Sequence, residues 1–360
     1  MAGAARPTRR EILERAARVG LVVAAAPLSG LAGCADGSTT ARTASESAEA
    51  TPVPSAASPP PTASAAATAA LSPSPDPGPV TVAITGDVML GRSVSSTIVA
   101  THDRYPFNDT ADDLRAYDLT VGNLECVVSL RGQPVPGKTY HFRADPVSYQ
   151  RLNAAGFDIV SLANNHCGDF GAGAFSDMLA ALPDHGIAPV GAGVDLTSAH
   201  LPVIRTVRST AIGFLAYCEI APTSFAATRS SPGHAWLDVA LMRSDITAVR
   251  PHVDQLIVFL HWGTEYATAQ TAHQRDVARA AVVAGADVVV GAHPHVVQPA
   301  ETHAGRPIVY SLGNFVFDEM NEDVVRRGNV LVLTLQGSRL LDWKLRPSFI
   351  TGNLGAPRWL

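Results

Sequence analysis

Residues 288–295 read VVVGAHPH, and the fold is most easily inferred by working outward from this stretch. Its three valines predict a buried strand, and two imidazoles follow directly after the end of that strand. If the segment is extended, His293 and His295 leave the same face of the backbone, and Pro294 biases His293 towards that geometry. Two imidazoles placed together at the end of a core strand favour a metal site over a pair of isolated histidines.

Apolar runs that end in polar residues recur along the chain from residue 80 onward. The runs that predict strands lie at 80–85, 119–121, 159–162, 212–216, 256–260, 288–290, 308–312 and 330–335. Stretches compatible with helices lie at 146–155, 173–182, 239–249 and 272–284. Strands alternating with helices in this way predict a layered α/β fold.

Five of the predicted strands end in residues that are able to bind a metal ion. Ligands bind at the carboxyl ends of strands in open α/β sheets, so we expect these ends to converge. The candidate metal ligands are Asp87, Glu125, Asn165, His261, His293 and His295. Mixed oxygen and imidazole donors favour Mn, Fe or Zn, and six donors fit two ions that share a carboxylate. Each residue alone also has an ordinary interpretation as a cap, a turn or a satisfied histidine.

The remaining histidines and the cysteines lack this context. We expect surface or helix positions for His102, His185, His200, His234, His252, His273 and His303. For His141 two interpretations stay open, a surface or helix position and a position that lines the cleft. If Cys34 is modified, the remaining cysteines are Cys126, Cys167 and Cys218. Their odd number argues against a disulfide framework, and the pairing of Cys126 with Cys167 is left open.

The N-terminal part of the sequence is typical of an exported, anchored protein. Residues 1–34 combine a basic region with a short apolar run, and Arg9-Arg10 resembles a twin-arginine signal. The sequence LAGC at 31–34 resembles a bacterial lipobox, with Cys34 as the lipidated residue, although a chance Cys after an ordinary signal peptide is the alternative. Ala, Pro, Ser or Thr occupies 36 of the 45 positions at 35–79, which predicts a disordered tether. We therefore expect an extracytoplasmic, lipid-anchored protein whose folded domain spans 80–360.

The charge of the chain limits its partners. The formal net charge is −5, and without residues 1–33 it becomes −8, from 22 basic and 30 acidic residues. An acidic domain lacks the basic surface on which nucleic-acid affinity depends, so we expect no nucleic-acid partner. The same charge disfavours long-range attraction of a polyanion unless bound metals and Arg92 dominate the local field.

Six motifs between residues 80 and 320 resemble those of a known family. They are TGDVMLGR at 85–92, GNLE at 122–125, SLANNH at 161–166, HWGTEY at 261–266, GAHPHVVQP at 291–299 and YSLGNF at 310–315. In these motifs the chain resembles the bacterial poly-γ-glutamate capsule-biosynthesis (CapA-like) family, whose fold resembles calcineurin-like metallophosphoesterases. The resemblance implies a layered sandwich of mixed β-sheets flanked by helices, holding one or two divalent ions (Mn, Fe or Zn).

The resemblance also implies roles for individual residues. Asp87 would be the first-strand ligand, and the position two residues later, an imidazole in the phosphoesterase pattern, is Met89. Glu125 is preferred to Asn123 as the bridging ligand, because an anion bridges two cations better than an amide does. Asn165, His261, His293 and His295 would complete the shell. His166 would donate a proton to the leaving group or stabilise developing charge.

The sequence constrains the residues around the site, and the reaction at it, less than it constrains the ligands. Arg92 would clamp an anionic group or be a solvated arginine at a helix start. The rim of the cleft is expected to hold Asn123, Asn164, Glu265 and Asn314. Three functions stay open, since activated water attacks phosphoryl and amide groups alike. They are a metal-dependent hydrolase that acts on an anionic polymer in capsule synthesis or export, a non-catalytic accessory that binds such a polymer or a capsule-machinery partner, and a phosphoester hydrolase unrelated to capsule.

Overall fold

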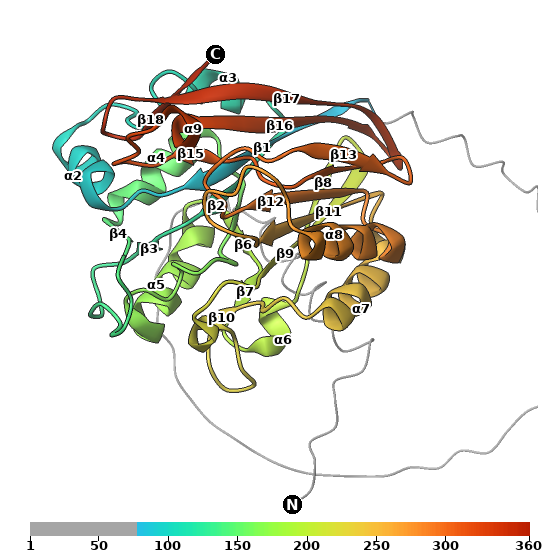
Figure 1. Cartoon of the computed structure of the whole chain (residues 1–360), viewed down its shortest axis with the longest axis horizontal. Helices are drawn as coiled ribbons and strands as arrows, with labels where there is room; N and C mark the ends of the chain where they lie inside the picture. The colour runs from blue at the N-terminus through green and yellow to red at the C-terminus, as the bar shows by residue number, and fades with distance from the viewer. Residues whose placement is uncertain (1–77) are drawn as a thin grey trace, which may run out of the picture. The chain divides into compact units, whose positions relative to one another are not determined.

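The structure is a computed structural model that describes residues 78–360 (Figure 1). The predicted export signal, Cys34 and nearly all of the predicted tether lie outside the described residues. Within residues 78–360, none of the helices combines the length and the apolar character that a membrane span requires.

Two mixed β-sheets form the centre of the described part of the chain. The first has the order β18-β17-β16-β1-β2-β5-β6, and β15 also pairs with β1. In it, β1, β2, β5, β6 and β15 run parallel, and β16, β17 and β18 are added antiparallel. Its strands are β1 (Val80–Val88), β2 (Leu119–Leu124), β5 (Ile159–Ser161), β6 (Ala188–Val190), β15 (Asn314–Val316), β16 (Arg327–Gln336), β17 (Arg339–Thr351) and β18 (Ala356–Trp359).

The second sheet has the order β13-β14-β12-β11-β9-β8. Its four inner strands are parallel, and both edge strands are antiparallel to their neighbours. The strands are β8 (Val203–Val207), β9 (Thr210–Cys218), β11 (Gln255–His261), β12 (Val288–Ala292), β13 (Ala300–His303) and β14 (Arg306–Val309). Two short pairs accompany the sheets: β3 (Val127–Val128) with β4 (Arg143–Ala144), and β7 (Ala192–Gly193) with β10 (Gly233–His234).

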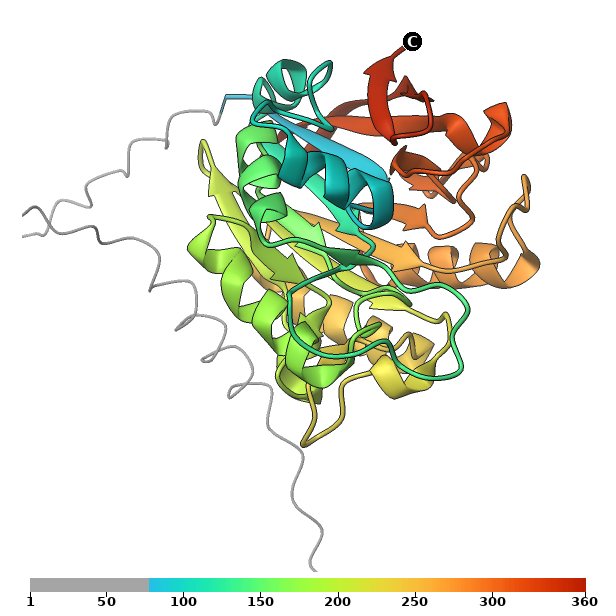
Figure 2. The ribbon, with the colours of Figure 1, turned by 90° about the vertical axis from the view of Figure 1, so that its left-hand side faces the viewer.

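Helices cover the outer faces of the sheets. Helices α2, α4 and α5 contribute to the apolar cluster on the first sheet (Figure 2), and α7 and α8 to that on the second (Figure 1). The helices are α2 (Arg92–Ala100), α3 (Ala111–Arg115), α4 (Val147–Ala155), α5 (Gly171–Asp184), α6 (Leu196–Ala199), α7 (Val239–Val249), α8 (Ala272–Ala284) and α9 (Asp323–Arg326), with 3₁₀ turns at Thr223–Phe225 and Arg250–His252.

The alternation of side chains along each strand builds these layers. In β11, Ile257 and Phe259 belong to the cluster that joins the two sheets, whereas Val258 and Leu260 pack with α7 and α8. Successive residues of a strand point to opposite faces, so a strand buried on both sides needs a continuous apolar run. Such runs are what the sequence has at β9, β11 and β12.

The predicted fold class is confirmed, because mixed sheets are layered on one another and flanked by helices. The four predicted helices are present, and α7 and α8 have the predicted bounds. The prediction missed β17, whose burial pattern is mostly exposed or half-buried. It carries no apolar run, and its strand geometry comes from pairing with β16.

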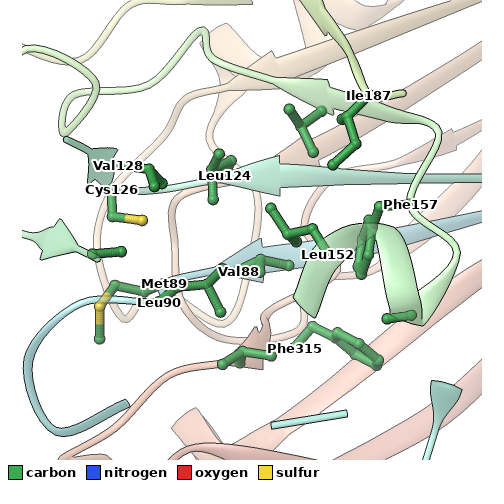
Figure 3. Close-up of a cluster of buried hydrophobic side chains, with 14 of the residues drawn as sticks. Val88, Met89, Leu90, Leu124, Cys126, Val128, Leu152, Phe157, Ile187 and Phe315 are labelled. Atoms are coloured by element: carbon green, nitrogen blue, oxygen red, sulfur yellow. The ribbon is translucent and has the colours of Figure 1, made fainter. Parts of the chain in front are cut away.

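The three cysteines within residues 78–360 are buried and unpaired. Cys126, Cys167 and Cys218 are all free, so the pairing that the sequence left open does not occur. Figure 3 shows Cys126 in the apolar cluster that also contains Met89 and Leu90.

Candidate metal centre

The carboxyl ends of strands from both sheets meet between the sheets, as the strand-end pattern predicts. Asp87, at the end of β1, has its Oδ2 atom 3.3 Å from Nδ1 of His295, which follows β12. Asn165, which follows β5, accepts a hydrogen bond through Oδ1 from Nε2 of His261 at 2.8 Å. Glu125 follows β2 and lies against the same imidazoles. The six predicted ligands therefore form one cluster, while their role as ligands stays a prediction.

A β-bulge in β1 turns Asp87 towards this cluster. Ile84 pairs with Val121, but Asp87 pairs with Asn123, so β1 has one extra residue between the two pairs. The extra residue reverses the alternation of the strand, and Asp87 therefore points between the sheets while Val88 packs on the helix side. Gly86 permits this geometry, because a Cβ atom there would lie 1.8 Å from the carbonyl oxygen of Gly313.

Glu125 has a strongly raised pKa in the cluster. Its side chain is fully buried, and neither carboxylate oxygen has a hydrogen-bond partner. Its Oε1 atom lies 3.7 Å from Nε2 of His261 and 3.9 Å from Nε2 of His295. Burial and the charge of Asp87 raise the pKa of Glu125 well above its ordinary value. A buried carboxylate without partners is costly, and a bound divalent cation would provide the missing partner. The donor set therefore fits a metal ion.

Within residues 78–360, three overlapping groups of side chains have ligand atoms within 4.8 Å of one another. They are Glu125 with His261 and His293, Asp87 with Glu125 and His295, and Glu265 with His293 and His295. Glu125 belongs to the first two groups, which fits the bridging role predicted for it.

Burial keeps two of the imidazoles in the form that binds metal. It lowers the pKa of His261 well below the ordinary value, and it lowers that of His293 to about 3, in both cases with help from neighbouring histidines. Nδ1 of His293 is buried without a partner. For His295, burial lowers the pKa, but the charges of Glu125 and Asp87 outweigh burial and raise it to about 9. Binding of a metal through His295 must therefore displace a proton.

The prediction that the His-Pro-His segment is extended is wrong. His293 has φ +94° and His295 φ +58°, in the left-handed region that non-glycine residues rarely adopt. β12 ends at Ala292, and tertiary contacts hold the strained turn: the His293 amide donates to Oδ2 of Asp87 at 3.3 Å. The two rings still lie together, with centroids 5.8 Å apart. Strain retained at such a position is typical of functional sites.

Three of the four predicted rim residues lie beneath the cluster instead. Asn123 donates to Oδ1 of Asp87 at 2.8 Å, and its own Oδ1 accepts from Asn164 at 3.1 Å. Asn314 accepts from Nδ1 of His295 at 3.0 Å. All three amides are at most 1% exposed; Asn123 and Asn314 hydrogen-bond candidate ligands directly, and Asn164 holds Asn123 in place. Glu265 alone of the four is exposed.

His166 is held by two residues that the sequence reasoning missed. Its Nδ1 atom lies 2.7 Å from Oδ2 of the fully buried Asp169 and 3.0 Å from Nζ of Lys138. Lys138 also pairs with Asp169 and donates to the backbone carbonyl of Asn165 at 2.6 Å. Burial lowers the pKa of His166 to about 4, so the ring is neutral near pH 7. The only signal in the sequence was the acid three residues after His166.

Arg92 begins α2, as its second predicted description has it, but its side chain is paired rather than solvated. Its Nε donates to Oδ1 of Asp318 at 2.8 Å, and Nη1 lies 3.1 Å from Glu319. The guanidinium also lies over the ring of Phe142, 4.9 Å from the centroid. Its charge is therefore already matched by two carboxylates, so it is neither a free anion clamp nor a solvated arginine.

One further histidine is misplaced by the sequence prediction. His234 lies in β10, fully buried, and neither ring nitrogen has a partner. Burial lowers its pKa to about 4. It is neither a surface nor a helix residue, because pairing of β10 with β7 carries it into the interior. His141, which the sequence left open, is half-buried with Nε2 2.7 Å from the carbonyl of Val135.

Comparison with known proteins agrees with the motif pattern. Residues 81–319 match the model of a family described as bacterial capsule synthesis protein PGA_cap. The PGA biosynthesis protein CapA of Bacillus subtilis is 33% identical over 242 residues, covering 67% of this chain and 64% of that protein. The capsule biosynthesis protein CapA of Bacillus anthracis is 31% identical over 247 residues, covering 67% and 60%. A probable polyglutamine synthesis accessory protein of Mycobacterium tuberculosis is 33% identical over 249 residues, covering 65% of each chain. The chain thus spans less than two thirds of the length of these relatives.

Solved structures are more distant. The calcineurin-like phosphoesterase YfkN of Bacillus subtilis superposes with a TM-score of 0.46 and 17% identity, covering 78% of this chain and 93% of that chain. A 5'-nucleotidase precursor of Thermus thermophilus superposes with a TM-score of 0.46 and 14% identity, covering 75% and 54%.

Proposed function

The chain belongs to the bacterial capsule synthesis protein family, and on that premise we propose that it is a metal-dependent hydrolase acting on an anionic polymer during capsule synthesis, processing or export. The observation that carries the proposal is Glu125, a buried carboxylate that follows β2 of the first sheet and has two unpartnered oxygens facing the imidazoles of His261 and His295 from the second sheet. A protein that only bound a partner through its surface would have no need of such a group.

In this proposal some residues bind the metal ions and others hold the ligands in position. Glu125 belongs to both buried ligand groups, one completed by Asp87 and His295 and the other by His261 and His293. Bound divalent ions supply Lewis acidity to a water molecule and to a phosphoryl or acyl oxygen. The Asn123, Asn164 and Asn314 amides fix the ligands and limit their reorientation.

His166 is held through Nδ1, which lies 2.7 Å from Oδ2 of Asp169 and 3.0 Å from Nζ of Lys138. These contacts fix the plane of the ring and leave Nε2 free of them. Because the pKa is about 4, His166 accepts a proton first and donates it only afterwards. The order differs from the simple proton donation expected from the sequence.

Metal content of the purified full chain tests the proposal. Two equivalents of Mn, Fe or Zn, lost in His293→Ala, together with hydrolysis of poly-γ-glutamate, would support it. If the replete protein holds no metal, the proposal is refuted and the accessory role remains. Hydrolysis of p-nitrophenyl esters alone, with no action on poly-γ-glutamate, would favour a phosphoesterase unrelated to capsule.

We also propose that the protein works outside the cytoplasmic membrane, anchored through lipid on Cys34. The lipobox-like sequence and the polar tether after it support this location. Cys34→Ser is expected to move the protein from the membrane fraction to the soluble fraction. Retention of the variant in membranes would contradict the anchor.

A further inference from the structure

Glu265 lies outside the two ligand groups that share Glu125, yet it stands close to the same centre. One of its carboxylate oxygens lies within 4.8 Å of a ring nitrogen of His293 and of His295, and these atoms form a third potential metal-binding group. The two imidazoles are at most 6% exposed, whereas Glu265 is exposed. The group therefore joins a surface carboxylate to the buried cluster.

The loop that carries Glu265 is braced against the His-Pro-His turn. The amide of Tyr266 donates to the carbonyl oxygen of Pro294 at 2.8 Å. Tyr266 itself has φ +63°, so the backbone turns at the residue next to Glu265. The buried Gln298 side chain donates to the carbonyls of Ala267 and Ala269, at 2.8 and 3.2 Å. These hydrogen bonds hold the backbone on the C-terminal side of Glu265 against the segment that carries His293 and His295, so the fold determines the position of Glu265.

The buried ligand groups provide fewer donor atoms than a bound Mn, Fe or Zn ion takes. The strand β1 contributes Asp87 alone, because Met89 packs in the helix-side cluster (Figure 3) and its Sδ accepts from the Gly91 amide at 3.0 Å. Asp87, Glu125 and His295 thus provide three donors, and Nδ1 of the buried His293 has no partner. Mn, Fe and Zn are bound by four or more donors, and carboxylate suits all three.

We infer that Glu265 is a third carboxylate ligand of this centre, binding a divalent cation together with His293 and His295. The inference rests on the metal centre of the proposed function and adds a ligand from the surface loop after β11. A carboxylate in that place closes the solvent side of the centre, so the ion is held by residues of both sheets and of the loop above them.

The test uses the full chain and Glu265→Gln, which removes the charge and keeps the shape. Titration calorimetry with Mn²⁺ or Zn²⁺ is expected to show that one equivalent binds at least about tenfold more weakly. Glu322→Gln is the matched control, because Glu322 is exposed, caps α9 without a side-chain hydrogen bond and belongs to no ligand group. Thermal unfolding without metal is expected to be the same in all three proteins.

Cobalt distinguishes a ligand from a nearby charge. The visible absorption of bound Co²⁺ depends on its donors, so Glu265→Gln is expected to change the spectrum. An unchanged spectrum, or unchanged affinity for Mn²⁺ and Zn²⁺, overturns the inference and leaves the proposed function intact. If the wild-type chain binds no metal at all, both are overturned.

Discussion

Replacing Glu125 by glutamine is expected to change stability in opposite directions with and without metal. In the metal-free protein the carboxylate is fully buried and both its oxygens lack partners. Leaving a buried polar group unpaired costs about 1–3 kcal/mol, and more when it is charged. Gln keeps the shape and is neutral at every pH, so it avoids both the cost of burying the charge and the cost of keeping the proton, and the metal-free variant is expected to be more stable by about 1–3 kcal/mol. For a domain of this size that raises Tm by about 2–4 °C per kcal/mol.

The sign of the pH dependence follows from the raised pKa of Glu125. Above about pH 4.5 the unfolded chain releases a proton that the folded, metal-free protein keeps, so wild-type stability falls as the pH rises. The advantage of Glu125→Gln is therefore expected to vanish near pH 4 and to grow towards pH 7. Denaturation curves of both proteins, recorded at several pH values in the presence of a chelator, measure this difference in the free energy of unfolding.

Metal reverses the order of stability. A ligand at 1,000 times its Kd stabilises the folded state by about 4 kcal/mol, and a 100-fold loss of affinity leaves about 1.4 kcal/mol. Loss of a ligand from both buried groups is expected to reduce affinity by at least about that factor. The reasoning is refuted if the metal-free variant is less stable than the wild type, or if metal raises the Tm of both proteins equally. Glu322→Gln serves again as the control.

Three further predictions concern other parts of the site and the interior. Asp169→Asn removes the partner that orients His166, and we expect kcat to fall about 100-fold with metal content unchanged; equal kcat would contradict this. His234 has a folded pKa of about 4, so below pH 6.5 the unfolded chain binds a proton that the folded chain does not, and stability falls by about 3 kcal/mol down to pH 4. His234→Leu is expected to flatten denaturation curves over that interval, and curves parallel to the wild type would refute it. Gly86→Ala would push β1 and β15 apart, and we expect a loss of about 1–3 kcal/mol and weaker metal binding, whereas Gly78→Ala, which meets only Arg208 at 3.6 Å, should be near neutral.

The sequence by itself determined the layers and the location of the cluster. Strands buried on both faces require continuous apolar runs, and these are visible at β9, β11 and β12 without any structure. Because parallel strands end at the same edge, polar residues after Leu260 and Val290 had to lie together there. Local pattern is enough for such conclusions, since strand period and chain direction depend only on neighbouring residues.

Only the tertiary structure decided which way the site residues point and what each one contacts. The bulge that turns Asp87 depends on pairing with β2 and β15, and the left-handed turn at His293 is held by contacts from another sheet. Lys138 contacts His166 from 28 residues away, and Asp318 pairs with Arg92 from 226 residues away. These features arise from contacts between distant segments, and the free energy that fixes them is absent from any short stretch of the chain.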